Sequence, residues 1–225
     1  MGELQSGRVD LSAIQAVLWD FGGVITSSPF EAFNRYEAAR SLPVGFVRQV
    51  NATNPDDNAW AKLERNEIDG DAFDRLFREE ALALGHDVRG GDILPLLSGD
   101  IRPRMVAALD AVKLAGYRIG CITNNAQVGH GSGMAASADA SRAVELILQR
   151  FDHVIESSKA GVRKPDPRIY LMMCEAIGIA PEACIYLDDL GINCKPAAAL
   201  GMKAIKVTSQ EQALEELGGL LGLLL

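Results

Sequence analysis

Four polar residues occupy equivalent places in the sequence, each just beyond an apolar run that is typical of a buried strand. They are Asp20, Thr123, Asp188 and Asp189. In an open α/β sheet the carboxyl ends of parallel strands meet at one edge, and ligands bind there. A single Asp at a strand end is often only a turn former or a helix cap. The joint pattern predicts three carboxylates and a hydroxyl gathered at one site.

Such a cluster predicts a particular chemistry. Carboxylates in close contact repel one another and resist ionisation. A hard cation such as Mg²⁺ removes that cost, because it prefers oxygen ligands of this type. A phosphate beside the metal would also need hydrogen-bond donors and a second cation, which Thr123, loop N–H groups and either Lys159 or Lys164 could supply. We therefore expect Mg²⁺ as the cofactor, with donors available for a phosphate beside it.

The elements that must position these residues follow from short apolar runs that alternate with helical patterns. We expect strands over 14–19, 117–122, 153–155, 184–187 and 203–207. We expect helices between them over 102–114, 140–150, 166–177 and 195–200. Strands and helices that alternate in this way predict an α/β fold, a doubly wound parallel sheet with helices on both faces.

The stretch from 30 to 97 breaks this alternation. It contains helical patterns over 35–40, 57–65 and 71–84 and no convincing strand. We expect a small helical insert at 29–97, placed after the first strand of an α/β core formed by 1–28 and 98–225. A Gly-, Ser- and Ala-rich segment at 128–140 reads as a loop, with His130 as a solvated residue within it.

Composition excludes several classes of function. The formal net charge of −8 argues against a nucleic-acid-binding face, because phosphates would meet no excess of positive charge. No apolar run approaches the roughly 20 residues of a membrane span. The first residues lack a secretion signal, and four cysteines without CxxC pairs suggest free thiols. We expect a cytoplasmic protein with no membrane partner.

The C-terminal segment is unusually apolar. Its Leu and Gly residues predict a last helix that packs against the core. The alternative interpretation is a contact surface with a second subunit. The sequence leaves the oligomeric state undetermined.

Four segments, in order along the chain, resemble the motifs of the haloacid dehalogenase superfamily. They are the stretches 18–26, 122–125, 163–170 and 186–196. The resemblance spans about 14–208, and the last two segments look most like the N-terminal phosphatase domain of soluble epoxide hydrolases and its bacterial relatives. It implies a Rossmann-like catalytic core and makes the helical insert at 29–97 a cap.

The resemblance also implies a role for each motif residue. Asp20 would attack phosphorus and form an aspartyl-phosphate intermediate. Asp20, Asp189 and the backbone carbonyl of Gly22 would hold Mg²⁺. Asp188 would be a further catalytic residue beside them.

The remaining motif residues would bind the phosphoryl group. The resemblance places Thr123 and the backbone of Asn124 on its oxygens and gives Lys164 the neutralisation of the developing charge. Lys164 is preferred to Lys159 because the Lys-Pro-x-Pro context follows it directly. Asn193 would order the loop of the fourth motif.

One residue departs from the pattern of the superfamily. Most of its phosphatases carry a second Asp two residues after the nucleophile, as general acid and base, and here that residue is Gly22. General acid–base assistance is typically worth about 10²- to 10⁴-fold. Its loss would hurt alkyl phosphates most and acyl or aryl phosphates less, because a poor leaving group needs a proton.

Three interpretations therefore stay open. The first is a phosphatase or phosphotransferase in which a good leaving group, a cap residue or a water replaces the missing acid. The second is a dehalogenase- or phosphonatase-type hydrolase, against which the Asp188-Asp189 pair counts, since dehalogenases need no metal. The third is a catalytically silent phosphate- or metal-binding relative. The candidates for substrate contacts in the cap are Trp60, Arg65, Phe73 and Phe77. The three aromatic residues are more typical of a helix core, and Arg65 could instead lie at a solvated helix end.

Overall fold

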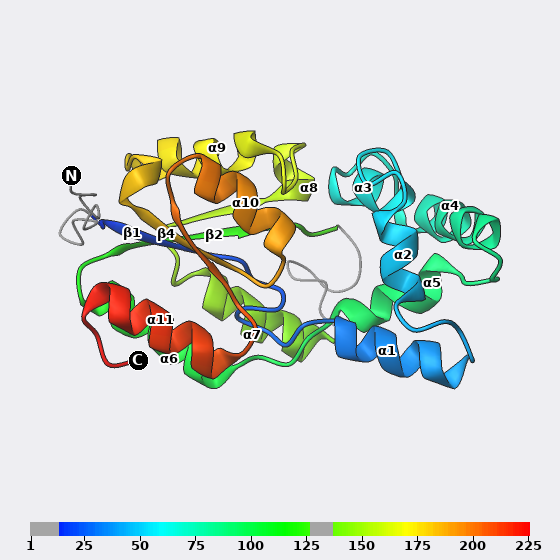
Figure 1. Ribbon diagram of the computed structural model, residues 1–225, viewed down its shortest axis with the longest axis horizontal. Helices are drawn as coiled ribbons and strands as arrows, with labels where there is room; N and C mark the ends of the chain where they lie inside the picture. The colour runs from blue at the N-terminus through cyan, green and yellow to red at the C-terminus, as the bar shows by residue number, and fades with distance from the viewer. Residues whose placement is uncertain (1–13, 127–136) are drawn as a thin grey trace, which may run out of the picture.

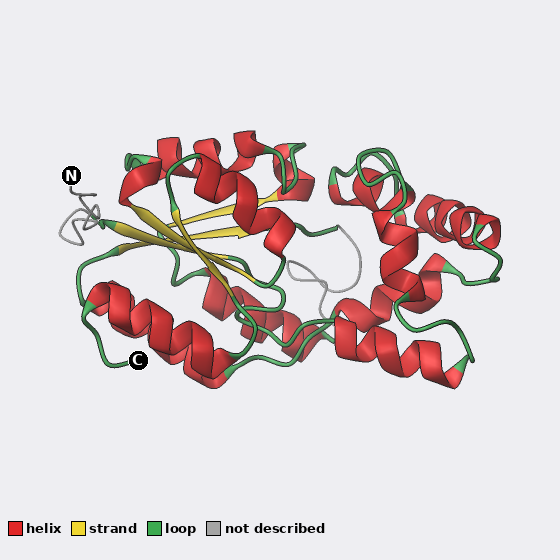
Figure 2. Ribbon diagram, in the orientation of Figure 1, coloured by secondary structure: helices red, strands yellow, loops and turns green. Residues whose placement is uncertain are grey.

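A five-stranded parallel sheet forms the centre of the computed structural model, which describes residues 14–126 and 137–225. Its strand order is β3-β2-β1-β4-β5. The strands are β1 (Ala16–Trp19), β2 (Arg118–Thr123), β3 (His153–Glu156), β4 (Cys184–Asp188) and β5 (Lys203–Lys206). The expected α/β fold with a doubly wound parallel sheet is confirmed (Figure 2).

Helices cover both faces of this sheet (Figure 1). One layer contains α6 (Pro103–Leu114), α7 (Ala138–Leu148) and α11 (Gln210–Leu221). The opposite layer contains α9 (Pro167–Ile177) and α10 (Gly191–Ala199), with α8 (Ser157–Ala160) and the 3₁₀ turn η3 (Pro181–Ala183) nearby. Successive strand side chains point to opposite faces. Val17 and Trp19 accordingly pack on the first layer, and Ala16 and Leu18 pack on the second.

Local sequence accounts for many of the helix ends. Pro103 and Pro167 occupy first turns, where a missing N–H costs nothing. Helix α11 begins with a capping box between Ser209 and Gln212. Its leucines pack in or against the core, as do Leu223 and Leu225 beyond it, which confirms the prediction for the C-terminal segment.

The segment between β1 and β2 is helical, as expected. It contains α1 (Phe30–Ala39), α2 (Phe46–Ala52), α3 (Ala59–Glu64), α4 (Gly70–Ala83), α5 (Gly90–Ile93) and the 3₁₀ turn η2 (Leu94–Leu97). Residues 30–97 are all described and contain no strand. They surround their own apolar cluster, and Figure 1 shows them beside the sheet domain. The domain limits at 28/29 and 97/98 stay a prediction.

Helix α2 was not predicted from the sequence. Its N-terminal N–H groups have no local Ser, Thr, Asp or Asn cap. They are satisfied instead by Glu37 of α1, whose carboxylate accepts from Gly45 N at 2.7 Å and from Val47 N at 3.0 Å. A cap supplied by another helix leaves no signal in the local sequence.

Helix α10 begins four residues before its predicted start at 195. Pro196 lies inside α10. Proline is normally found in the first turn of a helix and not in its interior, which is compatible with the predicted start at 195. The first turn forms because Leu190 N and the Asn193 side chain both donate to Asp188. Thr123 and Asp188 are also the last residues of their strands and do not follow them.

Several smaller expectations can also be compared with the structure. The four cysteines are free, as predicted, and all four are buried. Among the described residues, no helix has the length and apolar character needed to cross a membrane. The N-terminal residues 1–13 and His130, with most of its expected loop, lie outside the described residues.

Candidate active site

The topology brings the predicted strand-end residues to one place. Strand β1 lies between β2 and β4, and Trp19 is in register with both Cys121 and Leu187. Asp20 therefore leaves the sheet beside the ends of β2 and β4, and its N–H donates to Leu187 O at 2.8 Å.

Lys164 lies at the centre of this cluster. It comes from the loop between α8 and α9, its side chain is only 1% exposed, and its Nζ is 2.8 Å from both Asp20 Oδ1 and Asp188 Oδ2. Burial alone would lower the pKa of Lys164, but the charges of Asp188 and Asp20 outweigh it and raise that pKa. The ammonium group is therefore charged. Lys159 instead pairs with Glu156 and is largely exposed.

Asp188 uses both of its oxygens within the protein. Its Oδ1 accepts from Leu190 N at 2.8 Å and from Asn193 Nδ2 at 3.1 Å. Its Oδ2 accepts from Lys164 Nζ, from Asn193 Nδ2 and from the hydroxyl of Tyr186. With these donors in place, Asp188 anchors Lys164 and the start of α10 and has little capacity left for a metal ion.

Asp20 and Asp189 accept fewer hydrogen bonds than Asp188 does. Asp20 Oδ1 accepts from Phe21 N at 2.7 Å and contacts Lys164, whereas its Oδ2 has no hydrogen-bond donor among the described residues. Asp189 Oδ2 accepts from Ser28 Oγ at 3.0 Å. Burial raises the pKa of both carboxyls, and the neighbouring acidic residues, Asp188 first among them, raise it further. A divalent cation would offset this cost.

The donor set fits Mg²⁺. Oxygens of Asp20, Asp188 and Asp189 lie within 4.8 Å of one another. Since Asp188 is occupied by protein donors, the carboxylates that remain for a metal are Asp20 and Asp189. Gly23 permits their approach, because it has φ +74° and any Cβ there would lie 2.2 Å from Asp189 Oδ2.

A cavity of about 350 Å³ opens beside the cluster. Gly22, Thr123 and Asn124 line it, together with residues of the 97–101 segment. Gly22 faces open space, since a Cβ at this residue would meet nothing within 4 Å. A phosphate-sized ligand would therefore have room next to Gly22 and Thr123, which neighbour Asp20 in the chain and in the sheet.

The second-motif loop is held by its two asparagines. Asn124 Oδ1 accepts from Lys164 N at 2.8 Å, and Asn124 Nδ2 donates to Lys164 O at 3.0 Å. Asn125 is buried and bonds to Glu156, Ser157 and Ser158. These bonds hold the loop after Thr123 against the loop that carries Lys164.

The candidate substrate contacts of the helical insert are largely committed elsewhere. Phe73 and Phe77 are fully buried in the core of the insert, which confirms their interpretation as core residues and excludes them as substrate contacts. Trp60 stacks edge-on against Phe73 at 5.4 Å and donates its Nε1 to Glu64. Arg65 pairs with Glu67.

Sequence reasoning missed four residues of the site. Tyr186 could have been found, because it lies two residues before Asp188 and so shares its face of the strand. Arg163 begins the third motif segment, but neither it nor Ser28 or Glu64 carries a pattern that identifies its partner. Their contacts join segments far apart in the sequence.

Comparison with known proteins identifies the family. Residues 14–201 match the model of the haloacid dehalogenase-like hydrolases. The chain is 31% identical over 216 residues to mouse acyl-CoA dehydrogenase family member 10, covering 92% of this chain and 19% of that protein. It is 28% identical to pig bifunctional epoxide hydrolase 2, covering 91% of this chain and 38% of that protein. It therefore spans well under half of these two relatives.

A third relative matches over most of its own length. Phosphatase MT3486 of Mycobacterium tuberculosis (strain CDC 1551 / Oshkosh) is 29% identical, and the match covers 89% of this chain and 90% of that protein. Among solved structures, a Bacteroides thetaiotaomicron enzyme of the family in complex with magnesium and inorganic phosphate has a TM-score of 0.54. It is 22% identical, and the match covers 85% of this chain and 93% of that one. The chain belongs to the haloacid dehalogenase-like hydrolases.

Proposed function

We propose that the protein is a Mg²⁺-dependent phosphatase or phosphotransferase that acts on small phosphorylated metabolites through an aspartyl-phosphate on Asp20. One observation carries this proposal. The Lys164 ammonium lies 2.8 Å from both Asp20 and Asp188 and offsets part of their charge, while Asp20 and Asp189 keep oxygens for a metal and a reacting group. This arrangement suits attack on an electron-rich phosphoryl group.

The chain's residues would divide the reaction between two displacements. An oxygen of Asp20 attacks phosphorus, the bond to the leaving-group oxygen breaks, and that oxygen takes its electron pair and later a proton from solvent. Water then attacks the phosphorus of the aspartyl-phosphate, and the bond between phosphorus and the Asp20 oxygen breaks. Inorganic phosphate leaves, the carboxylate is restored, and a proton of the attacking water passes to solvent. Lys164, Thr123 and Asn124 stabilise the phosphoryl oxygens.

Asp20, Asp189 and the Gly22 carbonyl would hold the metal. Bound Mg²⁺ supplies Lewis-acid stabilisation of the phosphoryl oxygens and lowers the repulsion between the carboxylates. Asp188 keeps Lys164 in place through the contacts described above.

Gly22 narrows the substrate class. Without a carboxylate at this residue, substrates whose leaving groups need little protonation, such as acyl and aryl phosphates, are favoured. We propose that the helical insert at 29–97 acts as a cap, which favours small metabolites over macromolecular substrates. The 29% identity to a phosphatase over nearly its full length supports phosphoryl transfer.

The test is release of phosphate from acetyl phosphate and of nitrophenol from p-nitrophenyl phosphate, with Mg²⁺ or with EDTA. We expect activity that requires Mg²⁺ and that is abolished in Asp20→Asn. Folding of this variant should persist, because Lys164 keeps Asp188 as its partner. Thermal unfolding of both proteins serves as the control.

Other outcomes would redirect the assignment. Turnover in Asp20→Asn at the wild-type rate would refute the covalent mechanism. Inactivity of the wild type toward both phosphates, followed by turnover of haloacids or phosphonates, would establish the carbon-centred alternative. Phosphate or metal binding without any turnover would identify a silent relative.

A further inference from the structure

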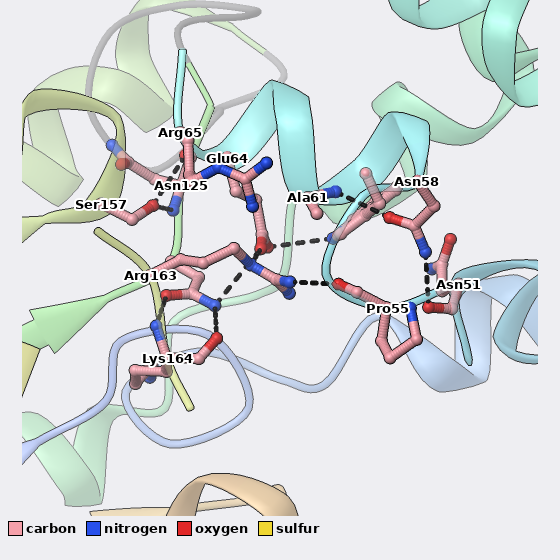
Figure 3. Close-up of polar contacts among 12 residues, drawn as sticks. Asn51, Pro55, Asn58, Ala61, Glu64, Arg65, Asn125, Ser157, Arg163 and Lys164 are labelled. Atoms are coloured by element: carbon pink, nitrogen blue, oxygen red, sulfur yellow. Dashed lines mark hydrogen bonds and ion pairs between the residues drawn. The ribbon is translucent and has the colours of Figure 1, made fainter. Parts of the chain in front are cut away.

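One contact joins the helical insert to the candidate active site. Glu64, at the end of α3, accepts from Arg163 Nε at 2.5 Å and from Asn124 Nδ2 at 3.3 Å through its Oε2. Its Oε1 accepts from Trp60 Nε1 at 2.9 Å. Figure 3 shows Glu64 and Arg163 pointing toward one another across the boundary between insert and core.

The two core partners of Glu64 lie next to residues of the proposed chemistry. Arg163 directly precedes Lys164, and Asn124 directly follows Thr123. Asn124 is also bonded to both the N–H and the carbonyl of Lys164. A single carboxylate of the insert therefore touches both loops that would bind the phosphoryl group.

Arg163 provides a second link to the insert. Its Nη1 donates to Pro55 O at 2.8 Å, so its guanidinium connects two points of the 53–64 region to the core. The side chains of Arg163 and Glu64 are only 18% and 12% exposed. Low exposure limits screening by salt and strengthens the ion pair. Helix α3 also lies against α8 of the core (Figure 1).

The contacts of Glu64 also decide what it does. Its oxygens accept hydrogen bonds from three donors, one of which is a guanidinium. A carboxylate that accepts three hydrogen bonds does not serve as the general acid that is missing because residue 22 is glycine. Its contribution is to hold positions.

We propose that Glu64 and Arg163 are positioning residues that fix the helical cap on the core and thereby align Thr123 and Lys164 for phosphoryl transfer. The part of this inference that concerns phosphoryl transfer rests on the proposed function. The contact between cap and core can be tested without turnover.

The kinetic test uses Glu64→Gln and Arg163→Lys with acetyl phosphate and Mg²⁺. Gln places an N–H₂ group among three donors, so we expect kcat to fall about tenfold to a hundredfold, as small misalignments do. The Mg²⁺ concentration for half-maximal activity should not change, because Asp20 and Asp189 are untouched. Arg163→Lys keeps the charge and should retain more activity than Arg163→Met.

Glu67→Gln is the matched control. Glu67 is three residues away from Glu64 and pairs with Arg65 within the insert, and among the described residues it makes no hydrogen bond or ion pair to the core. We expect it to leave kcat within about twofold of the wild type, since exposed ion pairs contribute little. An equal loss of kcat in Glu67→Gln would contradict a specific role for Glu64.

Acrylamide quenching of tryptophan fluorescence tests the same contact without turnover. The chain has two tryptophans, and Trp19 is fully buried, so quenching reports on Trp60. We expect greater quenching in Glu64→Gln and in Arg163→Met than in the wild type or Glu67→Gln. Wild-type quenching together with wild-type kcat in the Glu64 and Arg163 variants would overturn the proposal. An inactive wild type would count against the proposed function alone, and the quenching would still decide the contact.

Discussion

Replacing Gly22 by Asp tests whether the missing general acid limits the reaction. A Cβ at Gly22 meets no atom within 4 Å, and unlike Gly23 the residue does not have a positive φ. An Asp side chain can therefore be added without backbone strain or a steric clash. It would extend into the cavity that Thr123 and Asn124 also line.

The size of the effect follows from the role of the acid. General acid assistance contributes about 10²- to 10⁴-fold, or about 3 to 5 kcal/mol at 1.36 kcal/mol per tenfold. That gain applies only where the leaving group needs a proton. We expect kcat/KM of Gly22→Asp to rise about a hundredfold or more for glycerol phosphate and to change little for acetyl phosphate.

The assay is kcat/KM across acetyl, p-nitrophenyl, phenyl and glycerol phosphates at saturating Mg²⁺. Gly22→Asn is the matched control, because it has nearly the same shape as Asp but cannot donate a carboxylic proton. A uniform change across the four substrates, or an equal gain in Gly22→Asn, would refute the reasoning. The first would indicate a change in binding, and the second a change in the shape of the cavity.

Two further predictions concern metal binding and pH. Mg²⁺ at 100 times its Kd should stabilise the wild type by about 2.7 kcal/mol and raise its melting temperature. Asp189→Asn should abolish this rise, whereas the control Asp87→Asn should keep it. A rise in Asp189→Asn equal to that of the control would remove Asp189 from the metal site. Burial and Asp92 raise the pKa of Tyr36 to about 12, so its neutral form stabilises the fold below pH 10, and this stabilisation is lost as the pH rises toward 12. Urea unfolding at pH 9 and 11 should therefore show a smaller loss of stability in Tyr36→Phe than in the wild type, and equal losses would contradict this assignment.

The strand ends could be predicted because buried parallel strands leave a simple record in the sequence. Strand β1 is apolar at every residue, since both of its faces are covered, and Asp20 marks the point where burial by the sheet ends. Alternation with helices then makes the sheet parallel and aligns the strand ends at one edge. The gathering of Asp20, Thr123 and Asp188 follows from these two facts.

The link between insert and core could not be predicted in this way. Glu64 and Arg163 are 99 residues apart, and neither belongs to a local pattern that specifies its partner. The contact forms because α3 packs in the apolar cluster of the insert, whereas Val162, next to Arg163, packs against a cluster of the core. Helix α2 was missed for the same reason, since its cap comes from Glu37 of a neighbouring helix.

The adjacent glycines of the first motif show how chemical and steric requirements differ. Residue 23 must be glycine for steric reasons, because a side chain there would collide with Asp189. Its backbone also has a positive φ, which strains any residue with a side chain. Gly22 is under neither constraint. Packing therefore does not explain the absence of a carboxylate at Gly22, and the proposed function gives a chemical reason for it. A substrate with a good leaving group needs no acid at this residue, which is why we favour acyl and aryl phosphates over alkyl phosphates.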